Sequence, residues 1–316
     1  SSRIHRAAEV KLAVHPHGTY GVIGAALAVG KLMGFDARKM LELINVSATM
    51  GMTTSRQTLL DGATVRNIYT GHSGYMGTMA ARLVACGFTG EIDSISAIYG
   101  KILSDRFDPA RVVRDLGADW LITKSYFKLH PTGRYVHSAI DALEDLLEKV
   151  PRRRLDPTAI TRLDVRAYML AAMLQEKNVQ TSFGARFSVP FALASIIVRG
   201  RSGLASFDDA AVANPAIQSL ARRVELQEDP SFTARYPAEQ PVSIRAVMHD
   251  GSTFEGHCTL TKGEPTRPHT AAELRGKFFE LGEAVWTRPA TQALFDGLMH
   301  LEKIDDFRAF MDGLAL

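Results

Sequence analysis

The sequence predicts a mixed α and α+β protein, in which an all-helical domain is interrupted by an α+β lid domain that contains an antiparallel sheet. Three observations lead to this fold class: helical patterns fill about the first hundred residues, strand-like runs follow Gly117, and helical patterns return after Thr270. A chain of 316 residues is also long enough for two domains. We therefore expect a discontinuous helical domain of residues 1–107 and 269–316, with the lid domain at 108–268.

The central element of the predicted helical domain is the stretch AVHPHGTYGVIGAALAVGKLMGFD at residues 13–36. Almost every residue from 20 to 33 is apolar or glycine. Glycine costs about 1 kcal/mol relative to alanine inside a helix, so this many glycines indicate close packing against another helix. The histidines His15 and His17 precede this buried helix, at the end where free backbone N–H groups and the helix dipole favour an anion.

The other elements of the first hundred residues follow in order. Asp36 caps a second helix with an apolar face, and the polar stretch 53–69 is expected to be a loop. A third helix, lined with small residues, opens at Gly71 and ends at Gly87, a favourable C-terminal cap. Shorter helices are expected at 95–103 and 108–116.

The lid domain is predicted from its strand-like runs. These runs lie at 160–169, 222–227 and 242–248, and the last is expected to pair with 253–260 across the turn at Asp250-Gly251. Helices are expected after the motif KSYFKLHPTGRYVH, at 189–198 and after Asn214-Pro215. In the tail, Thr270 and Glu273 form a capping-box pattern that starts the first of the returning helices.

Composition and common motifs exclude several classes of function. The formal net charge is only +3 and the arginines form no sustained basic stripe, which argues against nucleic-acid binding. No apolar run reaches the roughly 18 residues needed to span a membrane. The isolated Cys86 and Cys258 argue against a disulfide framework, structural zinc or an iron–sulfur cluster, and favour a reducing, cytoplasmic location. Nucleotide-binding loops, GxSxG and HExxH are absent, so we expect neither a cofactor nor a metal.

What remains is a set of cationic and proton-transferring side chains in turns. Arginine binds carboxylates through two hydrogen bonds and histidine moves protons near neutral pH, so the set suits a substrate with several carboxylates. Any one of these residues, taken alone, is better explained by a surface or core position, and only the clusters together favour a site. The members are His15, His17, Arg56, Arg66, His72, Lys124, Lys128, His130, Arg134 and His137.

At these residues the chain resembles the MmgE/PrpD family, which includes 2-methylcitrate dehydratase, cis-aconitate decarboxylase and iminodisuccinate epimerase. The resemblance runs from His15 to about Phe278 in family order. It implies a helical domain with an α+β lid, usually a homodimer, and a metal-free site in the cleft between the two parts. The matching stretches are HPHGTYGVIGAALAVGKLMGFD, VRNIYTGHSGYMGTMAARLVACGFTG, KLHPTGRYVHSAIDAL, ARFSVPFALASIIVRG and GEPTRPHTAAELRGKF.

The resemblance also implies roles for single residues. His15 falls on a histidine of the decarboxylase-like site and Lys128 on a lysine of the lid motif, while Arg66 stands where many relatives have lysine. Two positions depart from the family pattern: Gly133 replaces a histidine of the decarboxylases, and Phe191 replaces a tyrosine found in many members. The family's N-terminal helical portion, which supplies an aspartate and another histidine, is also not in this sequence.

The leading hypothesis is a cofactor-independent hydro-lyase of the 2-methylcitrate dehydratase type, which moves a proton α to a carboxylate of a small di- or tricarboxylate. His15 and Lys128 are the catalytic candidates, and His17, Arg66 and Arg134 the substrate-binding candidates. An epimerase of the iminodisuccinate type is the close alternative, and decarboxylation ranks third because of Gly133. A catalytically silent carboxylate-binding or dimerisation protein is the alternative outside enzymes. We expect a homodimer, although the small-residue helix faces suit intramolecular packing equally well.

Overall fold

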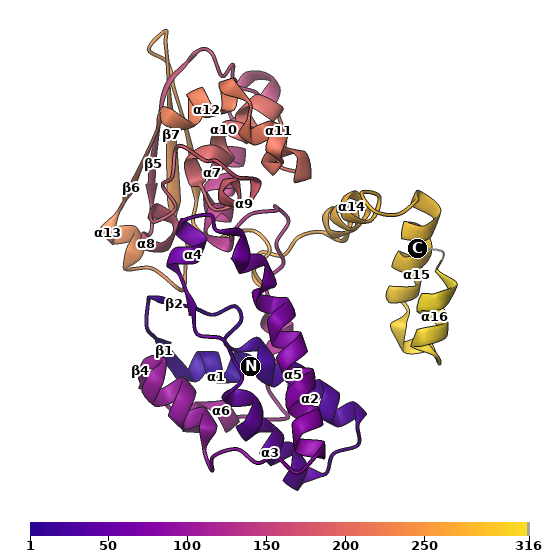
Figure 1. Ribbon diagram of the computed structural model, residues 1–316. Helices are drawn as coiled ribbons and strands as arrows, with labels where there is room; N and C mark the ends of the chain where they lie inside the picture. Colours follow the sequence, from indigo (N-terminus) through magenta and orange to yellow (C-terminus); the bar gives the residue numbers. More distant parts are fainter. Residues whose placement is uncertain (315–316) are drawn as a thin grey trace.

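The computed structural model describes residues 1–314. Figure 1 shows two bodies, one above the other, and a group of C-terminal helices to one side. The first hundred residues form the lower body, and the sheet with its helices forms the upper one. Within residues 1–314, no helix combines the length and the hydropathy needed to cross a membrane.

The lower body is built around two helices, α2 (Gly21–Leu32) and α5 (Tyr69–Ala85). Gly77 of α5 touches the backbone of α2 so closely that an added Cβ would lie 2.6 Å from Ala25 Cβ and 2.8 Å from the carbonyl of Val22. The glycines therefore serve helix packing within the chain. This is one of the two interpretations that the sequence left open for the small-residue faces. The remaining helices of this body are α1 (Ser2–Ala7), α3 (Ala37–Ala48), α4 (Gln57–Leu60), η1 (Thr64–Ile68), η2 (Ile95–Ile102) and α6 (Pro109–Val113).

Two short antiparallel ladders also belong to the lower body, and the sequence did not predict them. One joins β1 (Ala8–Val10) to β4 (Ser104–Phe107), and the other joins β2 (Val14–His15) to β3 (Thr54–Ser55). Their strands are too short to show an alternating pattern in the sequence. The stretch 53–69, expected to be a loop, accordingly holds β3, α4 and η1.

The upper body carries a four-stranded sheet in the order β6-β5-β7-β8. The pairs β5–β7 and β7–β8 are antiparallel as expected, but β5 and β6 run parallel, so the sheet as a whole is mixed. The parallel pair arises because helices connect β5 to β6 and return the chain to the end of the sheet where β5 began. The four strands are β5 (Ile160–Ala167), β6 (Val224–Glu228), β7 (Val242–Met248) and β8 (Thr253–Cys258).

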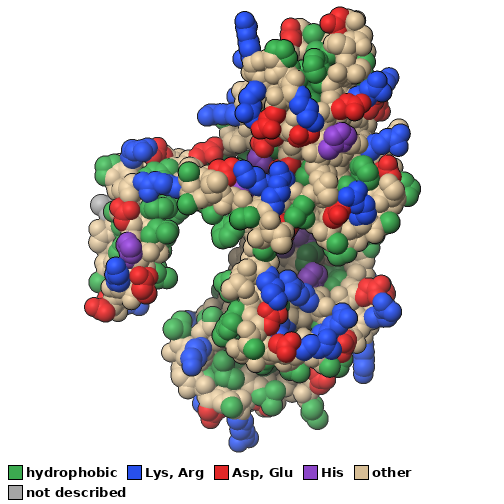
Figure 2. Space-filling view, turned by 180° about the vertical axis from the view of Figure 1, so that it is seen from behind, with side chains coloured by type: hydrophobic (Ala, Val, Ile, Leu, Met, Phe, Trp, Pro, Cys, Tyr) green, Lys and Arg blue, Asp and Glu red, His purple; other side chains and the backbone are tan. Residues whose placement is uncertain are grey.

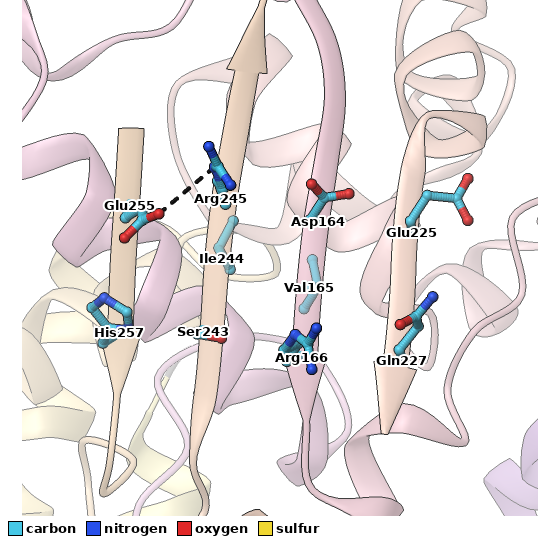
Figure 3. A pocket seen from close by; sticks show the side chains of 10 residues that line it. All are labelled: Asp164, Val165, Arg166, Glu225, Gln227, Ser243, Ile244, Arg245, Glu255 and His257. Atoms are coloured by element: carbon cyan, nitrogen blue, oxygen red, sulfur yellow. Dashed lines mark ion pairs between the residues drawn. The ribbon is translucent and has the colours of Figure 1, made fainter. Parts of the chain in front are cut away.

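Helices cover one face of this sheet and leave the other exposed. The core lies between the sheet and the helices α7 (Arg134–Glu148) and α10 (Val189–Arg199). Ile140 and Leu143 of α7 and Leu193 of α10 are fully buried there. On the open face, charged side chains of neighbouring strands stand side by side, as Arg245 and Glu255 do (Figure 3), 3.7 Å apart. The other helices of this body are η3 (Leu121–Lys124), η4 (Pro151–Arg153), α8 (Met169–Ala172), α9 (Ser182–Ala185), η5 (Leu204–Phe207), α11 (Asp209–Val212), α12 (Pro215–Arg222) and α13 (Pro230–Thr233).

The C-terminal helices begin at the expected capping box, in which Thr270 and Glu273 satisfy each other's backbone N–H groups. The first of these helices contacts the upper body: Glu280 accepts a hydrogen bond from the N–H of Leu204, and Lys277 donates to the carbonyl of Lys128. The expectation from the sequence that residues 269–316 and 1–107 form one helical domain stays a prediction. The elements are α14 (Ala271–Gly282), α15 (Arg288–Leu298), η6 (Leu301–Lys303) and α16 (Phe307–Gly313).

Candidate active site

A cleft of about 500 Å³ lies where the two bodies meet. Figure 2 shows a hollow at this junction with histidine side chains in it and lysine or arginine side chains near its rim. All five residues predicted as catalytic or substrate-binding line the cleft, although they come from distant parts of the chain. The lining residues are His5, His15, Pro16, His17, Arg56, Leu59, Arg66, Tyr126, Lys128, Gly133, Arg134, Tyr135, Tyr168, Phe187, Tyr236, Pro237, Gln240 and Glu264.

The turn that carries the two cleft histidines is held tightly against its neighbours. His15 ends β2 and pairs with Thr54 of β3, whose hydroxyl lies 2.8 Å from the carbonyl oxygens of both His15 and His17. The chain then turns at Gly18, where φ is +86° and an added Cβ would lie 3.2 Å from Thr54 and Tyr69. Glycine accepts this conformation without strain, so the local sequence and its neighbours fix the positions of both histidines.

Hydrogen bonds define which ring nitrogen of each histidine carries the proton. The backbone N–H of His17 donates to Nδ1 of His15 over 3.1 Å, and the guanidinium of Arg66 contacts Nδ1 of His17. In a neutral ring whose Nδ1 accepts a hydrogen bond, Nε2 carries the hydrogen. Burial, followed by the charge of Arg66, lowers the pKa of each histidine to about 4. Both rings are therefore neutral at pH 7 and present an N–H donor at Nε2.

Arg66 and Lys128 supply part of the positive charge of the cleft. Arg66 follows α4 in the short helix η1 and lies over the ring of Phe187, with its guanidinium carbon 5.8 Å from the ring centroid. Lys128 precedes α7 and donates to the carbonyl of Thr132 over 3.1 Å. Burial, followed by the charge of Arg66, lowers the pKa of Lys128, which favours the neutral amine more than in water.

Arg134 lines the same cleft, but its charge is already balanced. Its guanidinium lies 2.5 Å from Glu264, donates to the carbonyl of Lys262 and stacks over Tyr126, 4.4 Å from the ring centroid. Glu264 is the acidic residue among the described lining residues. Because this pair is neutral overall, the positive charge available to a ligand comes from Arg66, Lys128 and Arg56, whose guanidinium donates to the backbone carbonyls of Leu12 and Val14.

Some candidates from the sequence lie outside the cleft. His130 and His137 are buried beneath it with their rings 5.0 Å apart, and Lys124 pairs with Asp119 at the surface. His72 lies on α5 and is not among the lining residues.

The two positions that depart from the family pattern also differ in place. Gly133 lines the cleft, where an added Cβ would lie 2.7 Å from the ring of Phe187, so the phenyl ring takes the space of a side chain there. Phe191 is fully buried in the core against Phe207, with the ring centroids 6.5 Å apart.

Sequence reasoning missed the tyrosines of the cleft, Tyr126, Tyr135, Tyr168 and Tyr236. Their segments of the upper body are brought to the cleft only by the fold. An aromatic residue two positions before Lys128 and another next to Arg134 were the signals available in the sequence.

The fold and the site define a class: a two-body protein with a helical part, an α+β part and a cationic cleft between them that suits carboxylates. Comparison with known families agrees with this class. Residues 1–103 match the MmgE/PrpD N-terminal domain and residues 130–300 match the MmgE/PrpD C-terminal domain. The chain belongs to the MmgE/PrpD family, as its resemblance indicated.

Curated relatives of this chain are distant and longer than it is. The chain is 22% identical to cis-aconitate decarboxylase of Aspergillus terreus over 317 residues, which cover 94% of this chain and 64% of the relative. It is 22% identical to cis-aconitate decarboxylase of Mus musculus, with 92% and 60% covered. It is 23% identical to the cis-aconitate decarboxylase-like protein oryM of Aspergillus oryzae, with 92% and 63% covered. The chain thus spans less than two thirds of the length of these relatives.

Proposed function

We propose that this protein is a cofactor-independent lyase that acts on a small di- or tricarboxylate. The observation that carries the proposal is the convergence in one cleft of two neutral histidine N–H donors, the arginines Arg56 and Arg66, and one partly desolvated lysine. Such a set holds carboxylates and stabilises the negative charge that develops when a proton α to a carboxylate is removed. The names of the relatives support a lyase acting on a substrate of this kind.

The proposed reaction is the loss of water from a β-hydroxy carboxylate. Arg66 and the Nε2–H groups of His15 and His17 bind the carboxylate next to the reacting carbon. In its neutral form, which the lowered pKa favours, the amine of Lys128 takes the α-proton, the electron pair of the C–H bond forms the double bond, and the β-hydroxyl leaves with the proton that Lys128 returns. The products are an unsaturated carboxylate and water, and no cofactor enters the step.

This assignment changes the role of His15, which the sequence suggested as a catalytic candidate. Its Nδ1 already accepts a hydrogen bond from the N–H of His17. Its Nε2 therefore offers a hydrogen rather than a lone pair, which suits charge stabilisation. Lys128 is left as the proton carrier.

Decarboxylation is the second candidate, because the curated relatives are decarboxylases by name. We place it behind dehydration because Phe187 fills the space beside Gly133, where the decarboxylases carry a histidine by family resemblance. Epimerisation of an iminodisuccinate-type substrate uses the same proton removal and remains the third possibility. The alternative outside enzymes is a catalytically silent protein that binds the carboxylate without converting it.

The test is to incubate the purified chain with 2-methylcitrate, citrate, cis-aconitate and iminodisuccinate and to follow the products by NMR. We expect an unsaturated acid from the hydroxy acids, with kcat reduced by about 10²–10⁴-fold in Lys128→Met. Release of CO2 from cis-aconitate would show that the reaction is decarboxylation rather than dehydration. Binding of these acids without turnover of any would establish the silent alternative, and the absence of binding would overturn the proposal altogether.

We also propose a homodimer and a cytoplasmic location. The small-residue faces of α2 and α5 are used within the chain, so support for the dimer comes from the family resemblance. A monomer by light scattering at micromolar concentration would contradict it.

A further inference from the structure

The cleft has a second wall whose chemistry differs from that of the cationic one. Tyr168 is 1% exposed and stacks on Tyr236, with the ring centroids 5.2 Å apart and the rings inclined by 8°. Tyr135 meets Tyr168 edge to face, with centroids 6.4 Å apart at 86°. Tyr236 is 37% exposed although one of its faces is covered by Tyr168. The stack is thus supported from behind and open at Tyr236.

The tyrosines of this wall are uncharged. Burial raises the pKa of Tyr236 to about 12, so its phenol is neutral across the physiological range. Two arginines lie near these rings: Arg134 is paired with Glu264 and lies over Tyr126, and Arg56 donates to the backbone carbonyls of Leu12 and Val14. Next along the chain, Pro237 also lines the cleft and adds apolar surface. The wall thus presents stacked rings to an apolar group.

The volume of the cleft also leaves room for an apolar group. Its volume of about 500 Å³ falls within the roughly 300–1,000 Å³ typical of sites for drug-sized ligands. A six-carbon tricarboxylate held by Arg66, His15 and His17 is smaller than such ligands. Space along the tyrosine wall therefore remains for a further part of the substrate.

We propose that Tyr135, Tyr168 and Tyr236 form a subsite for an apolar substituent, alkyl or aryl, on the carboxylate substrate. The inference rests on the proposed function for the carboxylate end of the ligand. It narrows the substrate class from a small polycarboxylate to a polycarboxylate that carries an apolar tail. Tyr168 supports Tyr236 from behind, and Tyr236 and Tyr135 contact the tail.

The test uses citrate and citrates substituted at carbon 2 with methyl, butyl or hexyl groups. Binding is measured by calorimetry and turnover by NMR. We expect affinity to rise by up to about fourfold for each methylene buried against the wall. The tested variant is Tyr236→Ala, in which the ratio of hexyl to citrate affinity should fall towards one. Tyr236→Leu, which keeps an apolar side chain, should retain part of that ratio and guards against a folding defect in the alanine variant.

Tyr75→Ala is the matched control, because Tyr75 is 66% exposed on α5 and is not among the cleft residues. It should leave both the affinity and the ratio unchanged. An affinity independent of tail length in the native chain would overturn the subsite while leaving the lyase proposal intact. An equal loss of affinity for all four acids in Tyr236→Ala would also overturn the subsite. Tail-dependent binding without turnover would support the subsite and overturn the lyase, and no binding of any acid would overturn both.

Discussion

The guanidinium of Arg134 and the carboxylate of Glu264 lie 2.5 Å apart in the wall of the cleft, although 130 positions separate them in the chain. Arg134 begins α7, and Glu264 follows β8 in the segment that leads to α14. The pair therefore joins the start of the helix that underlies the sheet to the exit of the sheet. Its side chains are only 12% and 20% exposed. We assign Arg134 to positioning Tyr126 and the cleft wall rather than to direct substrate binding.

The first prediction follows from this burial. Arg134→Met removes the cation and leaves Glu264 as a mostly buried, unpaired charge, so the free energy of unfolding should fall by about 3 kcal/mol. The matched control is Arg106→Met, which breaks an ion pair with Glu9 whose side chains are 85% and 58% exposed and should cost less than about 1 kcal/mol. Urea denaturation of both variants measures the difference. Equal losses in the two variants would show that the buried pair has no special role in stability.

The second prediction separates charge stabilisation from proton transfer at His15. If its Nε2–H stabilises developing negative charge, His15→Phe should lower kcat by about 10²–10³-fold, the cost of losing one such donor. His15→Gln keeps an N–H donor of similar reach and should lose clearly less. Steady-state kinetics on whichever of the four tested acids the native chain converts provides the measurement. If the glutamine variant is as inactive as the phenylalanine variant, His15 is a proton carrier after all.

The third prediction concerns the helix contact at the centre of the lower body. Gly77→Ala places a methyl group 2.6–2.8 Å from atoms of α2 and should destabilise the fold by about 1–3 kcal/mol through overpacking. Gly74 lies one turn earlier on α5, and apart from the backbone of its own helix no heavy atom of residues 1–314 lies within 4 Å of the added Cβ. Gly74→Ala should therefore stabilise the fold by about 0.5–1 kcal/mol. Thermal denaturation should show melting temperatures shifted in opposite directions, and equal shifts would contradict the packing described here.

The fourth prediction is a loss of stability in acid, caused by the histidine pair beneath the cleft. Burial, followed by the charges of His269 and Lys277, lowers the pKa of His130 to about 4. Burial, followed by the charge of His130, also lowers the pKa of His137. The unfolded chain binds these protons near pH 6.5 and the folded chain does not. Stability should therefore fall as the pH drops from about 6.5 towards 4.

His137→Leu tests this origin of the acid sensitivity. The ring nitrogens of His137 are buried and have no hydrogen-bond partner within residues 1–314, so the variant should be at least as stable as the native chain at pH 7.5. Its melting temperature should then fall less steeply on acidification. His300→Gln, at an exposed histidine in the C-terminal helices, is the control and should keep the native pH dependence. An unchanged slope in His137→Leu would assign the acid sensitivity to other groups.

Much of the fold could be predicted because its signals are local. The capping box of Thr270 and Glu273 and the turn at Asp250-Gly251 each lie within a few residues of sequence, and the structure contains both. The family resemblance also selected His15 and Lys128, which do line one cleft. Residue type and short spacing carry this information because helix caps, turns and strand patterns depend on neighbouring residues.

The remaining features were decided only by the tertiary structure. The parallel pairing of β5 with β6, the ladder of β1 with β4, and the engagement of Arg134 by Glu264 all join segments far apart in the chain. The tyrosine wall has the same origin, because Tyr168 and Tyr236 meet through the packing of two loops. The sequence by itself thus determined the longer helices, the strands of the four-stranded sheet and the cationic residues of this protein. Only packing between distant segments decided which of those charges remain available to a ligand, since a charge is free or paired according to what the fold brings beside it.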